Sequence, residues 1–158
     1  MSETPNWWRA KLPDDTLVLW HEHPDPALIR VRFAAPIRLL KWLFGIFAFV
    51  YLLLAATGEA PPMRELPVWL ILLPCLGYLF LWTERFFCRN NVYVVTRNAV
   101  MSLNKFDADI SLVMDKYLHF NRDGHSISFP HHPTVVWKYL ADPAATLAAL
   151  KSAQRLHQ

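Results

Sequence analysis

The sequence is poor in glycine, cysteine and charge, and each shortage argues against a class of protein. Glycine occurs 4 times and cysteine 2 times in 158 residues, and charged residues make up 18%. Four glycines are too few for a phosphate-binding glycine loop. Cys75 and Cys88 do not indicate a structural disulfide in a reducing compartment, so both are expected to be small apolar side chains. Soluble domains carry about 25% charged residues, so the low charge favours a membrane protein.

Sequence motifs of the common catalytic sites are missing as well. The chain has no GxSxG motif, and no histidine lies near Cys88 in the sequence, so neither a serine nor a cysteine nucleophile is indicated. The carboxylates on turns and strand edges form no recognisable acid–base arrangement; these are Glu22, Asp107, Asp109 and Asp123. We therefore expect a chain that is not an enzyme, with no catalytic residue, no metal and no cofactor.

Two apolar runs, residues 42–58 and 66–83, help to bring the hydrophobic content of the chain to 54%. Neither run contains a charge or a polar face, which a helix of a soluble protein should have. A bilayer core needs roughly 20 mainly apolar residues, so each run with its flanks predicts a transmembrane helix. Because the connection is short, the two runs predict a transmembrane hairpin over residues 42–84. The alternative is a pair of buried helices in a soluble protein.

Basic residues flank the two runs and are scarce in the loop between them. Since the cytoplasmic flanks of membrane helices are rich in Lys and Arg, both chain ends are predicted in the cytoplasm. The net charge of +3 then partly reflects these flanks, which lie near anionic headgroups, and does not indicate a nucleic-acid partner. The predicted basic residues at the membrane surface are Arg30, Arg32, Arg38, Lys41, Arg85, Arg89 and Arg97.

Aromatic side chains are crowded on both runs, where they offer large, rigid surfaces to other membrane subunits. Aromatic side chains that face lipid are the alternative. Tryptophans in the N-terminal tail and in a late strand are further candidate contacts. The predicted partner-contact residues are Trp7, Trp8, Trp42, Phe47, Tyr51, Trp69, Tyr78, Trp82 and Trp137.

The chain before the first run predicts a tail, one strand and a surface segment. Residues 1–15 have no sustained period and predict a loose N-terminal tail. Residues 16–41 predict a strand over 16–23 and then an amphipathic lead-in that runs along the membrane surface.

The chain after the second run predicts a strand-rich cytoplasmic domain over residues 91–156. Short β-branched and aromatic segments follow one another there; they are residues 92–97, 99–105, 109–115, 116–121, 125–130 and 134–140. Asp123-Gly124 fits a primed hairpin turn. Asp142 as the N-cap and Pro143 at the first helical position predict a C-terminal helix. Antiparallel strands followed by one helix predict a small sheet or partial barrel closed by that helix.

Seven histidines raise the question of a metal site. His21 and His23 would point to the same face of a strand, which is one element of such a site. A further ligand would have to come from His119, His131 or His132, so exposed imidazoles are the simpler interpretation. No histidine lies in either apolar run, which excludes a haem held by a histidine pair from these spans.

The order of these parts resembles bacterial membrane proteins that carry a pleckstrin-homology-like domain. In those proteins the segment after the helices begins with Tyr-x-(Val/Leu)-Thr and a basic or polar turn, and Tyr93, Val95, Thr96 and Arg97-Asn98 match it. Residues 12–33 and 127–150 are also similar to the photosynthetic reaction-centre assembly proteins of purple bacteria, which belong to the same superfamily.

The resemblance implies a membrane α+β fold, in which a two-helix transmembrane hairpin carries a pleckstrin-homology-like sheet. It implies a non-catalytic accessory or assembly subunit of a bacterial inner-membrane complex, with photosynthesis as one setting. Its partners would be the lipid bilayer and other integral membrane subunits. One alternative is a stand-alone lipid- or stress-responsive binding module, although the loop that would hold lipid phosphate has a single cation, Arg97. The other is a metal-binding or enzymatic membrane protein that uses His21 and His23.

Overall fold

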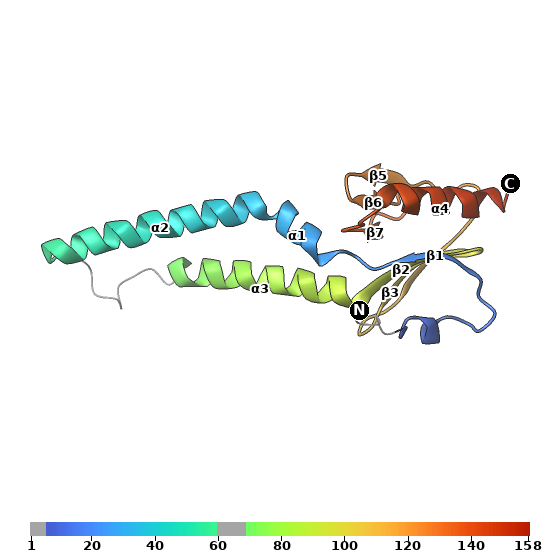
Figure 1. The fold of residues 1–158 in the computed structure, drawn as a ribbon, viewed down its shortest axis with the longest axis horizontal. Coiled ribbons are helices and arrows are strands. Elements are labelled where there is room, and N and C mark those ends of the chain that lie inside the picture. The colour runs from blue at the N-terminus through green and yellow to red at the C-terminus, as the bar shows by residue number, and fades with distance from the viewer. Residues whose placement is uncertain (1–5, 60–68) are drawn as a thin grey trace. The chain divides into compact units, whose positions relative to one another are not determined.

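The computed structural model describes residues 6–59 and 69–158, without the side chains of residues 69–71, 73 and 74 (Figure 1). The chain divides into two compact units. The sheet unit consists of Met1–Leu28 and Arg85–Gln158, and the helical unit consists of Ile29–Glu84.

The helical unit contains α2 (Ala34–Thr57) and most of α3 (Trp69–Asn90). A short helix, α1 (Pro26–Arg32), precedes α2, and Phe33 separates the two. The residues 34–41 were expected to lie in a surface segment, but they form the first turns of α2. The helix tolerates Pro36 because this residue lies in the first turn, where a backbone N–H would make no hydrogen bond within the helix. α2 ends at Gly58, whose φ of 79° is typical of a residue that terminates a helix.

α2 is the one helix in the described part of the chain that is long and apolar enough to cross a membrane. None of its most apolar stretch is buried inside the protein. The second predicted run lies largely in α3, which continues beyond residue 83 through Glu84 and Arg89 to Asn90. The start of that run, residues 66–68, lies outside the described residues. Of the two predicted membrane spans, only the first is thus a candidate span among the described helices.

The larger sheet is antiparallel and has the strand order β1-β2-β3-β4. Its strands are β1 (Val18–Glu22), β2 (Asn91–Thr96), β3 (Ala99–Asn104) and β4 (Ile110–Val113). β1 pairs with β2 in the register Trp20↔Val95 and Glu22↔Tyr93. The strand that precedes the helices therefore belongs to the same sheet as the strands that follow them, and the strand-rich unit is larger than the predicted 91–156.

β2 is buried on both faces, which explains its nearly continuous run of valines. Tyr93 and Val95 belong to the main hydrophobic core, whereas Val92 and Val94 belong to a second cluster on the opposite face. Trp8 covers this second face, and only 1% of its surface is exposed. The expectation of a loose tail is thus wrong for the described residues 6–12, which include the short 3-10 helix η1 (Arg9–Lys11). Residues 1–5 lie outside the description.

The smaller sheet is antiparallel with the order β5-β6-β7. Its strands are β5 (Asn121–Asp123), β6 (Ser126–Ser128) and β7 (Val136–Trp137). Asp123 pairs with Ser126, so the tight turn consists of Gly124 and His125 and lies one residue later than predicted. Gly124 has a φ of 56°, as a primed turn requires at its first central residue. Two sheets therefore replace the single sheet or partial barrel that was expected.

The C-terminal helix α4 (Pro143–Arg155) confirms the capping prediction. The carboxylate of Asp142 accepts hydrogen bonds from the N–H groups of Ala144 and Ala145, both at 3.0 Å. Leu150 and Ala153 on α4 are fully buried in the main core.

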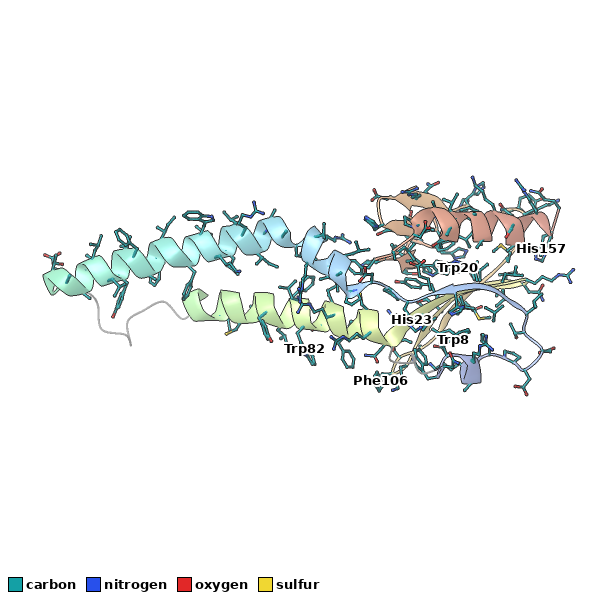
Figure 2. All side chains as sticks on the ribbon, viewed as in Figure 1. Trp8, Trp20, His23, Trp82, Phe106 and His157 are labelled. Carbon is teal, nitrogen blue, oxygen red and sulfur yellow. The ribbon has the colours of Figure 1, made fainter. Side chains whose placement is uncertain are left out.

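Trp137 lies in the centre of that core and contacts three other rings. Tyr93 stacks on it at 4.9 Å, Trp20 at 6.1 Å, and Phe129 meets it edge-on at 5.7 Å between ring centroids. Trp20 and Trp8 therefore mark the two sides of the larger sheet (Figure 2). These rings join β1 and β2 of the larger sheet to β7 of the smaller sheet, in the same core that Leu150 and Ala153 of α4 enter.

Candidate membrane and partner surface

Beyond Lys41, the surface of α2 is apolar on every side. Trp42 is 68% exposed and Phe49 63% exposed. Burying one such side chain is worth about 1.5–3 kcal/mol, so a whole helix of exposed apolar side chains would be costly in water. Surfaces of this size mark contact with a membrane or with another protein. The exposed apolar residues of α2 include Leu39, Trp42, Leu43, Phe44, Ile46, Phe49, Val50, Leu52, Leu53 and Leu54.

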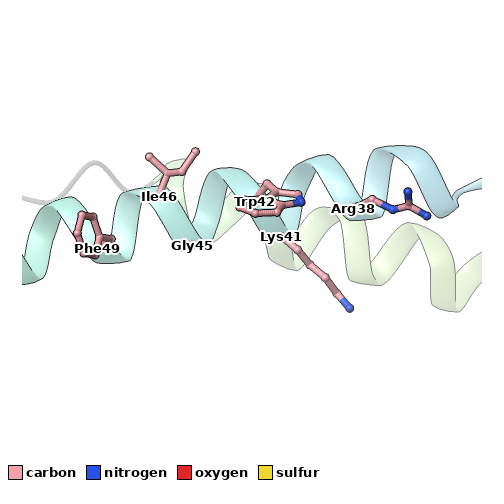
Figure 3. A pocket seen from close by; sticks show the side chains of 6 residues that line it. All are labelled: Arg38, Lys41, Trp42, Gly45, Ile46 and Phe49. Atoms are coloured by element: carbon pink, nitrogen blue, oxygen red, sulfur yellow. The ribbon is translucent and has the colours of Figure 1, made fainter.

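A groove with a volume of about 550 Å³ runs along one face of α2 (Figure 3). Gly45 is one of its lining residues, and a β-carbon at Gly45 would have no described atom within 4 Å. The lining residues recur at helical spacing and so share one side of the helix; they are Arg38, Lys41, Trp42, Gly45, Ile46 and Phe49. The groove is basic at one end and apolar along the rest.

The predicted basic residues are mostly exposed. Arg30, Arg38, Lys41, Arg89 and Arg97 are exposed, as is Arg32, while Arg85 is half-buried. Lys11 forms an ion pair with Asp109 at 2.8 Å, and Arg30, Arg38, Lys41, Arg89 and Arg97 take no part in it. The exposed side chains of Arg30, Arg38, Lys41, Arg89 and Arg97 are therefore accessible to anionic groups outside the chain.

The predicted partner-contact residues of the helices are exposed or half-buried. Tyr78 is 73% exposed and Trp82 56% exposed on α3, while Phe47 and Tyr51 on α2 are half-buried. The side chain of Trp69 lies outside the described residues. The helical unit thus presents most of these aromatic rings at its surface.

Two of the predicted contact residues lie in the interior of the sheet unit and not at its surface. Trp8 and Trp137 are 1% and 0% exposed, because each is the largest side chain of a hydrophobic cluster of the sheet unit. Neither offers a surface to a partner, and this correction removes both from the candidate interface. Trp7 is half-buried beside them, with the ammonium of Lys11 5.8 Å from its ring.

An aromatic and basic cluster of the sheet unit was not predicted. The rings of Phe86 and Phe106 stack at 5.6 Å, Phe87 lies 6.3 Å from Phe86, and the ammonium of Lys105 lies 5.5 Å from Phe106. Phe106 is 66% exposed at the tip of the β3–β4 loop (Figure 2). An aromatic residue between the charges of Lys105 and Asp107 was the sequence signal that could have revealed it.

The β3–β4 loop is fixed by Asn104. The side-chain oxygen of Asn104 accepts hydrogen bonds from the N–H groups of Phe106 and Asp107, at 2.8 and 3.0 Å. Its amide nitrogen donates to the side chain of Asn91 at 2.6 Å. Because Asn104 is buried, its hydrogen bonds fix the backbone of the loop while the ring of Phe106 stays exposed.

The histidines are distributed over the sheet unit. His21 lies against Trp8, with ring centroids 4.7 Å apart, and His119 lies 5.2 Å from His131. Burial lowers the pKa of His23, and the nearby His21 lowers it further, while a hydrogen bond with the backbone of Asn91 opposes both. No three His, Cys, Asp or Glu side chains gather at metal-binding distance within residues 6–59 and 69–158.

Glu22 has a structural position beside α4. Its Oε1 accepts hydrogen bonds from the N–H groups of Ala141 at 2.6 Å and Asp142 at 3.3 Å. Its Oε2 accepts one from the hydroxyl of Thr146 at 3.1 Å. The carboxylate therefore joins β1 to the beginning of α4.

The fold defines a class: a chain with one long apolar helix and a compact α+β unit of two antiparallel sheets and a C-terminal helix. No family model, curated protein or solved structure matches the chain. The relationship to pleckstrin-homology-like membrane proteins and to reaction-centre assembly proteins stays a prediction.

Proposed function

We propose that the chain is a non-catalytic accessory or assembly subunit of a bacterial inner-membrane complex. In this proposal α2 and α3 cross the membrane as a hairpin and dock on helices of partner subunits. The sheet unit, with a pleckstrin-homology-like role, braces the cytoplasmic face of the complex, and both chain ends are cytoplasmic.

The observation that carries the proposal is the surface of α2. Most of its aromatic and aliphatic side chains are exposed, and none of its most apolar stretch is buried inside the described chain. Membrane helices associate through close van der Waals packing, for which rigid aromatic surfaces are suited. The exposed Tyr78 and Trp82 extend the same character to α3.

The aromatic and basic cluster supports a position of the sheet unit at the membrane surface. Phe86, Phe87 and Phe106 are exposed apolar rings, and Lys105 and Arg89 are exposed cations close to them in the sequence. Aromatic rings beside Lys and Arg favour the interface between acyl chains and anionic headgroups.

A photo-crosslinking experiment at native expression tests the proposal. A photoreactive amino acid at Tyr78 is expected to give a discrete adduct with an integral membrane protein, because that side chain is 73% exposed on α3. The same amino acid at Tyr117, which is 68% exposed in the sheet unit, is the matched control. Deleting the chain should also lower the amount of the crosslinked complex on native gels.

The result that would contradict the proposal is a chain without any protein partner. If purification in a mild detergent returns only the monomer, and Tyr78 gives adducts with lipid alone, the accessory-subunit proposal fails. The stand-alone lipid-binding module would then be the better description.

A further inference from the structure

We propose that the groove on α2 binds one anionic diacyl phospholipid. The phosphate group contacts Arg38 and Lys41, and one acyl chain lies over Gly45 between Trp42 and Phe49. This inference rests on the proposed function in one respect, because α2 must lie in a bilayer for the groove to meet lipid.

The length of the groove fits one leaflet. Its lining residues extend from Arg38 to Phe49, which at 1.5 Å per residue is roughly 16 Å along the helix axis. The hydrocarbon core of a bilayer is about 30 Å thick, so one leaflet is about half of that. An acyl chain that starts at the headgroup therefore ends near Phe49.

The charges of the groove select the headgroup. Arg38 and Lys41 are both exposed, lie three positions apart on one helix face, and take no part in the ion pair of the described chain. The other described lining residues are apolar or glycine. An anionic phospholipid has the same arrangement, since its negatively charged phosphate lies where its acyl chains begin. The phosphate would meet the two cations, and an acyl chain would meet the apolar residues.

Gly45 has no explanation within the described chain. Glycine in the interior of a helix weakens it, and it is usually retained where backbone or side chains come close. No described atom lies within 4 Å of a β-carbon built at this position, so no described contact requires the missing side chain. An occupant from outside the chain, lying in the notch between Trp42 and Phe49, accounts for it.

Native mass spectrometry of the full chain in detergent tests the inference. The probes are phosphatidylglycerol and phosphatidylcholine with identical palmitoyl and oleoyl chains. The wild-type chain should retain phosphatidylglycerol in preference to phosphatidylcholine. The double variant Arg38→Gln/Lys41→Gln should lose this preference, by about fivefold for each charge, which corresponds to about 1 kcal/mol per cation at a membrane surface.

Matched variants separate the groove from general charge and shape effects. Lys151→Gln/Arg155→Gln removes two exposed cations of α4, outside the groove and outside the basic residues assigned to the membrane surface, and should keep the preference. Gly45→Leu fills the notch and should lower retention of phosphatidylglycerol, while Ala55→Leu, outside the groove, should not.

Three results would overturn the inference. They are equal retention of the two lipids by the wild-type chain, an equal loss in the control variants, and a protein adduct in place of a lipid adduct from a photoreactive group at Phe49. Alkaline extraction of membranes distinguishes the two proposals. A chain that stays in the membrane without lipid preference refutes the groove alone, whereas a chain that is extracted refutes both.

Discussion

Trp8 is the residue that ties the N-terminal segment to the larger sheet. Its ring is 1% exposed and packs with Val92, Val94 and Leu103. Trp8→Ala should cost about 3–5 kcal/mol of unfolding free energy, because it leaves a large cavity under the sheet. Thermal unfolding of the full chain in detergent, followed by near-UV circular dichroism, measures this loss. Leu17→Ala at a 65% exposed position is the control, and an equal effect of the two changes would contradict the assigned burial.

Glu22 is the second residue whose role depends on contacts distant in the sequence. Glu22→Gln removes the charge and leaves one side-chain oxygen to serve groups of Ala141, Asp142 and Thr146. We expect a loss of about 1–2 kcal/mol, since hydrogen bonds to a charged group are the stronger ones. Urea unfolding of the full chain in detergent checks it, with the exposed Asp14→Asn as control. A Glu22 variant as stable as the control would show that the carboxylate contributes nothing.

His23 makes the sheet unit sensitive to acid. Its pKa in the folded protein is lowered, first by burial and then by His21, from the ordinary value of about 6.5. The unfolded chain therefore binds the proton more readily, so the contribution of His23 is fully present above pH 6.5 and is lost as the pH falls toward the lowered pKa.

The pH dependence gives a direct comparison. The melting temperature of the wild-type chain should fall between pH 7.5 and pH 5.5, and His23→Gln should reduce that fall. His132→Gln, at an exposed position, should leave it unchanged. A His23 variant with the wild-type pH dependence would show that another group titrates.

Among the structural elements, the β5–β6 hairpin depends on the backbone geometry of its turn. Gly124 has a φ of 56°, which a residue with a β-carbon adopts only with strain. Gly124→Ala should therefore cost about 1–2 kcal/mol, measured by thermal unfolding of the full chain. The control is Asn98→Ala in the β2–β3 turn, where φ is not positive. Equal melting temperatures for the two variants would contradict the turn assignment.

Local signals explain which elements could be predicted from the sequence. Residues 92–97 and 99–105 contain alternation and β-branched residues, and they form β2 and β3. Asp142 and Pro143 signal the start of α4 through contacts within a few residues of each other. In such elements the cause of the structure lies within the segment itself, so the sequence reveals it.

Non-local packing explains the errors. The segment 116–121 has the composition of a strand, but Leu118 and Phe120 pack in the main core without a ladder partner, and only Asn121 enters β5. The burial of Trp8 and Trp137 depends on strands that lie far away along the chain. A tryptophan in a polar tail or a short strand gives no local sign of whether a core or a partner covers it.

The candidate site was predicted in part. The exposed rings on α2 and α3 were expected from the apolar runs, and the basic residues from their flanks. The groove at Gly45 and the stacked Phe86 and Phe106 were missed, because each arises from the way side chains meet in space. Helical spacing of Arg38, Trp42 and Gly45 is the sequence feature that could have suggested the groove.

At the scale of the whole molecule, both ends of the chain form one unit. The described residues 6–28 and 85–158 belong to one compact unit, and the helical segment lies between these two parts in the sequence. If the chain is placed in a membrane as proposed, α2 and α3 must cross in opposite directions, because β1 and β2 pair in one sheet. The pairing of β1 with β2 therefore favours an even number of crossings.

Cysteine labelling in cells tests this topology most directly. With Cys75 and Cys88 replaced by serine, single cysteines are introduced at Glu59, after α2, and at Asn121, in β5. We expect a membrane-impermeant maleimide to label Glu59→Cys in intact cells and Asn121→Cys only after lysis. Labelling of Asn121→Cys in intact cells, or recovery of the chain without detergent, would contradict a membrane hairpin with a cytoplasmic sheet unit.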